Sequence, residues 1–205
     1  MRVLPSGTTA VLVELDDLDA VLGLYAALVD DVPHGVIDVV PAARTVLVVT
    51  DPSVTSLSSV ADAVRRTTPR KDQRGSGELV EIPVTYKGDD VEEAAQLLDC
   101  DVAELVRRHT ADEWTVAFCG FAPGFGYLTS KAWQVNVPRR SSPRKCVPLG
   151  SVALAGEFSG VYPRESPGGW QLIGRTDLAV FDLSRDPAAL LRPGTRVRFL
   201  DVGRA

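Results

Sequence analysis

The sequence predicts a two-domain α+β protein, with an N-terminal domain over residues 1–78 and a C-terminal domain over residues 79–205 that carries the site. Helical and strand periodicities alternate in the first part of the chain. In the later part, short apolar runs are separated by Gly and Pro, which is typical of a β-barrel or sandwich. Between the two parts, residues 65–77 are polar, basic and poor in apolar residues, as expected of a linker.

The N-terminal elements follow in the order β-α-β-β-α. We expect a strand over residues 8–15, a helix capped by Asp16 or Asp17, strands over residues 36–41 and 44–50, and a second helix opened by Ser53 or Thr55. With one more strand this order is ferredoxin-like. Residues 78–87 alternate as a strand and either close this domain or enter the second one.

Two short helices come next, each announced by an Asp-x-x-Glu capping box, at residues 89–92 and 101–104. His109 lies on the apolar face of the second helix. Two interpretations stay open for it: a hydrogen-bonded core residue, or a group that titrates near neutral pH beside the glycine-rich loop that follows.

Composition excludes several classes of function. A net charge of −5 argues against nucleic acid as a partner, and no run of about 20 apolar residues predicts a membrane span. No signal peptide is evident, and three scattered cysteines fit a reducing cytoplasm. Neither an HExxH motif nor a phosphate-binding GxxxxGK[ST] loop occurs, and two histidines cannot form a three-histidine site, so we expect no metal centre.

The candidate site is the stretch from Trp114 to Thr176, where Gly, Pro, aromatic and cationic residues are interleaved. Ordered loops of this composition often carry binding and catalytic groups. Turns of a barrel share the pattern, so the amides near Gly124 and Gly126 form either an anion-binding nest or a plain tight turn. We expect substrate contacts from Phe121, Pro123, Gly124, Phe125, Tyr127, Arg139, Tyr162, Ser166, Gly168, Gly169, Trp170 and Gln171.

Three motifs in this stretch, GFAPGFGYL, SPRKCVPLGSVALAG and YPRESPGGWQLIGRT, resemble the subunit 1 family of allophanate-hydrolase-type proteins. That family includes the B subunit of the prokaryotic ATP-dependent 5-oxoprolinase and Kip-type kinase inhibitors. It is also similar to half of the carboxyltransferase region of urea carboxylase. The resemblance covers nearly the whole chain, weakly before Glu81. It implies an N-terminal α+β domain and a C-terminal cyclophilin-like β-barrel.

The resemblance also implies a function, which is the B subunit of a complex that converts 5-oxoproline to glutamate with ATP. The implied cofactor is ATP with Mg²⁺, bound by this chain or by a partner. The implied partners are a subunit 2 or C-like protein of carboxyltransferase type and a hydantoinase-like A subunit. Carboxyl transfer, allophanate-type hydrolysis and non-enzymatic inhibition of a histidine kinase remain alternatives within the family.

Chemistry suggests roles for the four catalytic candidates Glu165, Arg144, Arg175 and His109, with Tyr127 as an alternative to His109. Phosphorylation of a lactam oxygen needs cations, for which Arg144 and Arg175 are candidates, and a carboxylate that positions water, for which Glu165 is the candidate. His109 or Tyr127 would move protons. Glu165 also has a structural alternative, because a carboxylate on a stiff Pro-Gly-Gly loop can cap the amides of its own turn.

Overall fold

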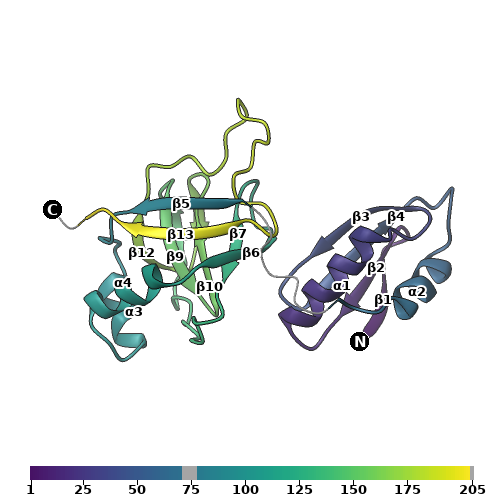
Figure 1. The fold of residues 1–205 in the computed structure, drawn as a ribbon, viewed down its shortest axis with the longest axis horizontal. Helices are drawn as coiled ribbons and strands as arrows, with labels where there is room; N and C mark the ends of the chain where they lie inside the picture. Colours follow the sequence, from purple (N-terminus) through teal and green to yellow (C-terminus); the bar gives the residue numbers. More distant parts are fainter. Residues whose placement is uncertain (71–77, 204–205) are drawn as a thin grey trace. The chain divides into compact units, whose positions relative to one another are not determined.

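The computed structural model describes residues 1–70 and 78–203. These residues form two compact units, divided between residues 74 and 75 (Figure 1). The first two residues of the predicted linker, Arg65 and Arg66, end a helix. Residues 71–77 of that linker lie outside the described residues.

The first unit is a four-stranded antiparallel sheet with two helices packed on one face. Helix α1 (Leu18–Asp30) is capped by Asp17, whose carboxylate accepts the amide of Ala20 at 2.8 Å, as predicted. Helix α2 (Leu57–Arg66) is capped by Ser56, one residue after the predicted start. The strands, in sheet order, are β1 (Arg2–Ser6), β2 (Ala10–Glu14), β4 (Thr45–Thr50) and β3 (Val36–Pro41).

The edge strand β1 was not predicted, and it changes the order of elements. A ferredoxin-like chain would add its last strand after α2. Here β1 fills that edge place by pairing with β2, and the strand after α2, β5 (Leu79–Val84), belongs to the second unit. The interpretation that residues 78–87 enter the second domain is therefore the correct one.

The second unit is a seven-stranded sheet that curls into a nearly closed barrel, consistent with the expected cyclophilin-like barrel (Figure 1). A bridge between Thr85 and Arg175 joins its two edges. Strands β13 and β5 are parallel, whereas the other neighbours are antiparallel. The sheet order is β12 (Gln171–Arg175), β9 (Ser151–Ala155), β10 (Phe158–Val161), β7 (Gly126–Thr129), β6 (Trp114–Cys119), β13 (Arg196–Asp201) and β5.

Two helices and one ribbon complete this unit. Strands β8 (Arg144–Val147) and β11 (Ser166–Gly168) pair as a two-stranded ribbon outside the seven-stranded sheet. Helix α4 (Val102–Ala111) has the predicted cap, because Asp101 accepts the amide of Glu104 at 2.7 Å. The capping box at Asp89 is wrong: helix α3 (Val91–Leu97) begins after Asp90, which makes no side-chain cap bond.

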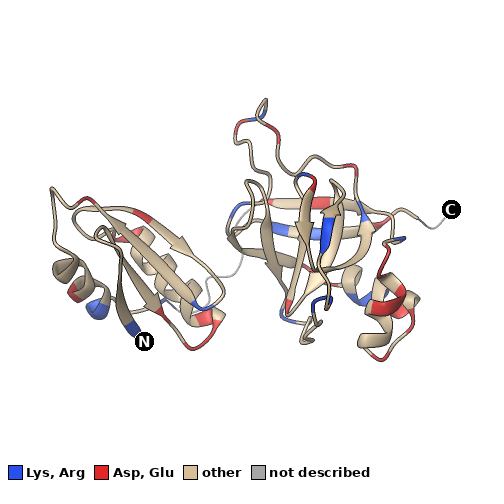
Figure 2. Cartoon of the chain, turned by 180° about the vertical axis from the view of Figure 1, so that it is seen from behind, with Lys and Arg blue, Asp and Glu red and all other residues tan. Residues whose placement is uncertain are grey.

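Side chains of the two units are mixed in charge. Figure 2 shows Lys and Arg interspersed with Asp and Glu over both units. Within residues 1–70 and 78–203, no helix is both long and apolar enough to cross a bilayer.

Candidate active site

The outer face of the barrel offers a floor of small side chains. Along β9, Val152 and Leu154 point into the barrel core, whereas Ala153 and Ala155 belong to a second apolar cluster. Because successive residues of a strand face opposite sides, the two alanines lie on the outer face. Alanines leave room above the sheet for large rings.

Five predicted substrate contacts gather over this floor as one aromatic cluster. The Phe125 ring centre lies 5.3 Å from those of Phe121, Tyr162 and Trp170, and 5.1 Å from that of Tyr127. Phe125, Tyr162 and Trp170 are buried, whereas Phe121 is 56% exposed. The structure therefore brings these five together as one cluster of packed rings that is open to solvent at Phe121, and the proposed binding surface at that open edge is called here the aromatic pocket.

Two predicted glycines are required by close approach. A Cβ at Gly168 would collide with the Tyr162 hydroxyl. A Cβ at Gly124, whose φ is +82°, would lie 2.5 Å from Cβ of Phe181. Both positions therefore need glycine to let rings pack against backbone.

The polar groups of the aromatic pocket are two phenols and one guanidinium. Burial raises the pKa of Tyr162 to about 12, while the positive charges of Arg139 and Arg144 and the amide of Trp170 act in the opposite direction. Burial also raises the pKa of Tyr127, again opposed by Arg139. Arg139 is exposed and forms no ion pair with any other described residue. Its charge, which acts on both phenols, is therefore available to an anionic ligand.

In the glycine-rich turn, three backbone amides donate to carbonyls of the same turn. Within it, Gly120 donates to the carbonyl of Phe125 at 3.2 Å, and Phe125 donates to that of Ala122 at 3.0 Å. Ala122 donates to the carbonyl of Gly120 at 2.7 Å. Of the amides near Gly124 and Gly126, that of Phe125 is therefore already paired, which favours the plain turn over the anion-binding nest.

The remaining predicted contacts surround the pocket. Pro123 is exposed. Ser166 is buried and its hydroxyl donates to the carbonyl of Arg164 at 3.2 Å. The Gly169 carbonyl accepts the amide of Arg140 at 2.9 Å. Gln171 is buried with its amide nitrogen 3.4 Å from the carbonyl of Pro138.

Arg144 is not free to bind a phosphoryl group. Both of its terminal nitrogens bond the carboxylate of Asp90 at 2.7 Å, and Arg140 bonds the same carboxylate. A bidentate pair of this kind uses the donors that a phosphate would need. The pairing favours a structural role for Arg144, and its catalytic role stays a prediction.

Arg175 and Glu165 also lie apart from the aromatic pocket. Arg175 is exposed at the far end of β12 from Trp170, where its backbone pairs with Thr85. Glu165 is exposed and receives a hydrogen bond from the thiol of Cys146. Val147 and Ser166, their neighbours in the ribbon, are buried, so Cys146 and Glu165 face outward. The expected catalytic roles of both residues are not supported by these positions.

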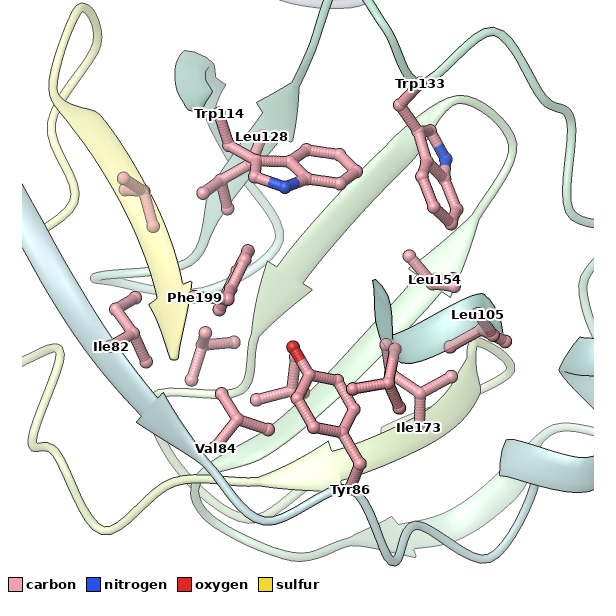
Figure 3. Close-up of a cluster of buried hydrophobic side chains, with 14 of the residues drawn as sticks. Ile82, Val84, Tyr86, Leu105, Trp114, Leu128, Trp133, Leu154, Ile173 and Phe199 are labelled. Atoms are coloured by element: carbon pink, nitrogen blue, oxygen red, sulfur yellow. The ribbon is translucent and has the colours of Figure 1, made fainter. Parts of the chain in front are cut away.

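His109 is a core residue of the barrel. Its ring is fully buried, stacks on Phe199 at 4.3 Å and bonds the hydroxyls of Tyr86 and Ser159 at 2.7 and 2.9 Å. Figure 3 shows the Tyr86 hydroxyl pointing into this cluster, near Phe199 and Trp114. Burial lowers the pKa of His109 to about 3. The ring is thus neutral at pH 7 and sealed from the aromatic pocket, which corrects its expected role in proton transfer.

A separate hollow of about 930 Å³ lies in the first unit. Hydroxyl side chains line much of it, together with His34 and Arg66, and no described carboxylate does. It lacks the combination of rings, phenols and an unpaired cation that marks the aromatic pocket, so the latter is the better candidate.

Residues 1–191 match the family described as "Carboxyltransferase domain, subdomain C and D". The chain belongs to this family. Two curated relatives, each named as the B subunit of 5-oxoprolinase, are close in length to this carboxyltransferase chain. The one from Bacillus subtilis is 36% identical over 91% of the chain and 85% of the relative. The one from Escherichia coli O157:H7 is 38% identical over 95% and 93%.

Solved structures show the same carboxyltransferase fold alone and within longer chains. PH0987 from Pyrococcus horikoshii is 33% identical, with a TM-score of 0.59 over 99% of this chain and 98% of that one. TTHA0988 is 33% identical, with a TM-score of 0.76, and this chain spans 40% of its length. The K. lactis urea amidolyase is 18% identical, with a TM-score of 0.76 over 16% of that chain, which shows the fold alone.

Sequence reasoning missed Asp90, the carboxylate that binds Arg140 and Arg144. The Asp-Asp pair before α3 was interpreted as a helix start, which hid the second carboxylate. The four cations within residues 139–145 indicate that a carboxylate lies near them, but they do not identify it.

Proposed function

We propose that this chain is the B subunit of an ATP-dependent 5-oxoprolinase, which opens 5-oxoproline to glutamate. Two relatives of nearly equal length carry that name. The word "subunit" in those names describes proteins of a multi-subunit complex. A C-like carboxyltransferase-type subunit and a hydantoinase-like A subunit are the proposed partners here.

The observation that carries the proposal is the ring cluster that contains Tyr127 and Tyr162, together with Arg139, whose positive charge acts on both phenols. 5-Oxoproline is a flat five-membered lactam with one carboxylate. A guanidinium is the preferred partner of a carboxylate, and aromatic walls suit a small ring. The two hydroxyls would bind the lactam oxygen or nitrogen.

The lactam is resonance-stabilised, so its opening is coupled to ATP. The amide oxygen attacks the γ-phosphorus and ADP leaves. Water then adds to the lactam carbon, and the carbon–nitrogen bond breaks to give an acyl phosphate. A second water hydrolyses this to the side-chain carboxylate and phosphate. We assign protonation of the leaving nitrogen to Tyr127, because its phenol carries a proton at pH 7 and its ring belongs to this cluster.

The cations for phosphoryl transfer are assigned to a partner. Arg144 is paired with Asp90, and Arg175 lies away from the aromatic pocket. Phosphoryl transfer depends on Mg²⁺ and cations around the γ-phosphate. ATP with Mg²⁺ is therefore proposed to bind mainly on another subunit, with this chain holding the lactam.

The test is glutamate formation from 5-oxoproline by the reconstituted three-subunit complex, with and without this chain. ATP-dependent turnover that requires the chain is expected. Arg139→Gln is expected to raise KM about 10-fold or more by loss of the carboxylate's partner, whereas Arg164→Gln, at another exposed arginine, leaves KM within about twofold. An assembled complex that forms no glutamate would refute the proposal.

A further inference from the structure

The hollow of about 930 Å³ in the first unit takes no part in the proposed reaction. Three connections between elements line it. They are the β1–β2 turn with Thr8, the α1–β3 loop with Pro33 and His34, and the β4–α2 loop with residues 52–56. Pockets of roughly 300–1,000 Å³ are the size that holds a small organic molecule. The volume therefore suits such a ligand.

One wall of the hollow depends on a glycine. Gly35 has a φ of +79°, and a Cβ added there would lie 2.5 Å from Cγ2 of Thr55. The amide of Asp51 donates to the Gly35 carbonyl at 2.8 Å, which ties the α1–β3 loop to the β4–α2 loop. The two loops thus pack directly on each other, and Pro33 and Thr55 are both held at the hollow.

Helix α2 contributes one of its faces to the hollow. Its lining residues are spaced three or four positions apart, as Ser56, Ser59, Ala63 and Arg66. Residues with this spacing lie above one another on a helix. The small side chain of Ala63 leaves room between the hydroxyl of Ser59 and the guanidinium of Arg66. The hollow therefore follows α2 from its first turn to its last.

The lining of the hollow is rich in hydroxyls and carries positive charge. Among residues 1–70 and 78–203, no Asp or Glu lines it. Nor does any described carboxylate pair with Arg66, whereas its neighbour Arg65 pairs with Asp62 at 2.9 Å. The guanidinium of Arg66 is therefore available to a ligand. Six hydroxyl side chains line the same hollow, on Thr8, Thr50, Ser53, Thr55, Ser56 and Ser59.

These groups select an anion that also carries hydroxyls. A guanidinium only donates hydrogen bonds, and it matches the oxygens of a phosphate. Hydroxyls both donate and accept, so they suit the hydroxyls of a sugar or polyol. Those of Thr8 and Thr55 have no partner within the described part of the chain. A site for Mg²⁺ with a nucleotide usually includes carboxylates, and none of the described ones lines this hollow.

We propose that the hollow of the first unit binds a small sugar or polyol phosphate. The phosphate lies beside Arg66 and Ser59, and the hydroxyls of the ligand bind the β4–α2 loop at Thr55 and the β1–β2 turn at Thr8. This is a second binding site, apart from the aromatic pocket. It is measured by binding alone, so it stands or falls separately from the proposed function.

Titration of the isotope-labelled full chain with glycerol phosphate, followed by NMR, tests the proposal. Saturable shifts of the amides of residues 34–35 and 53–60 are expected, with a Kd of about 1 mM or lower. Succinate, which matches the charge, and glycerol, which lacks it, should each bind at least about 10-fold more weakly. No saturable shift below about 20 mM glycerol phosphate would overturn the proposal. So would equal affinity for succinate or for glycerol.

Two neighbouring arginines provide a matched pair of variants. Arg66→Gln should raise the Kd for glycerol phosphate about 10-fold, because it removes the charged partner of the phosphate. Arg65→Gln should leave the Kd within about twofold, since Arg65 does not line the hollow. Both side chains are exposed, so both variants are expected to fold, with circular dichroism melting as the check. Equal effects of the two substitutions would reduce the binding to general charge attraction and overturn the proposal.

Two neighbouring serines provide a second pair. The hydroxyls of Ser58 and Ser59 lie 2.9 and 2.8 Å from that of Ser56, but only Ser59 lines the hollow. Ser59→Ala should raise the Kd about fivefold by loss of one hydrogen bond, whereas Ser58→Ala should leave it unchanged. An unchanged Kd in Ser59→Ala, or an equal rise in Ser58→Ala, would contradict the proposed placement of the phosphate.

Discussion

Glu165 and Ser166 are neighbours in sequence but face opposite sides of the chain where β11 begins. Ser166 is buried, and Glu165 shares the outer side with Cys146, whose pKa its carboxylate raises through a hydrogen bond. A catalytic carboxylate must come within hydrogen-bond reach of the reacting water. The orientation of a single side chain therefore decides which of these loop residues can act.

Replacing Glu165 tests this orientation. Glu165→Gln in the reconstituted complex should leave turnover within about threefold of the parent, because the side chain faces away from the aromatic pocket. Loss of a positioned base would instead cost about 100-fold. Turnover is measured as glutamate formation, with circular dichroism melting as the folding control. A 100-fold loss with folding intact would return Glu165 to the mechanism.

Several aromatic residues of the candidate site could be predicted, because rings that pack on glycine appear in the sequence as aromatic residues interleaved with Gly. Phe125, Tyr162 and Trp170 were expected and do meet. The charged residues were harder to assign. Whether Arg139 or Arg144 is free depends on the long-range partner Asp90, 54 residues before Arg144, and no local pattern reports such a contact.

At the scale of elements, the ribbon of β8 and β11 is held by close steric packing as well as by ion pairs. Gly168 lies directly against the Tyr162 ring, with Cζ at 3.0 Å from the position of an added Cβ. Gly169 is different, since an added Cβ would lie 3.5 Å from Pro143, which is ordinary contact. Adjacent glycines of the same loop thus differ in how much space surrounds them.

This difference predicts opposite outcomes for two alanine substitutions. Gly168→Ala should destabilise the chain by about 1–3 kcal/mol, as for other overpacked sites, and displace the Tyr162 phenol. Gly169→Ala should be nearly neutral. Urea unfolding gives the free energies, and Trp fluorescence reports on the aromatic pocket. Equal urea midpoints for Gly168→Ala and Gly169→Ala would show that the ribbon accommodates the added methyl group without loss of stability.

The barrel core should carry a pH dependence through His109. Burial lowers its folded pKa to about 3, below the unfolded value of about 6.5. A depressed folded pKa stabilises the fold above the unfolded value, and this stability is lost as pH falls. Between pH 7 and about pH 5, the loss is about 2 kcal/mol. Urea unfolding at both pH values measures it, and His109→Gln should remove it. An equal pH dependence in the parent and the variant would contradict the assignment.

Elements with a local signal were predicted well, whereas elements defined by a partner were not. Helices α1 and α4 begin after the expected Asp17 and Asp101, because a cap and an apolar stripe are local features. Strand β1 has no alternating pattern of its own and exists by pairing with β2. The predicted Asp89 cap failed because Asp90 serves a contact distant in sequence.

On the scale of the whole molecule, one exposed aromatic ring is a candidate contact for a partner protein. Phe121 is 56% exposed and held at a φ of +65°, an uncommon backbone conformation for a residue with a side chain. Exposed aromatic residues beside a pocket are frequent anchors of interfaces. We therefore place Phe121 in the contact with the proposed C-like partner.

Light scattering and calorimetry on the two purified proteins test this contact. A stable complex is expected at micromolar concentration, and Phe121→Ser should weaken it about 10-fold or more with the melting temperature unchanged. Leu183→Ser is the control, because Leu183 is an exposed apolar residue in another loop. Separate elution of the two parent proteins, or equal effects of the two substitutions, would exclude Phe121 as an anchor.

The parallel pairing of β5 with β13 has a consequence for biosynthesis. On the ribosome β5 emerges before every other strand of its sheet, yet its partner emerges after all of them. The first unit can fold during translation, since its sheet is complete before β5 appears. The barrel cannot be completed until β13 is translated, and until then β5 stays solvated or bound to a chaperone. A ribosome that stalls before residue 196 would therefore carry a folded first unit and an open barrel.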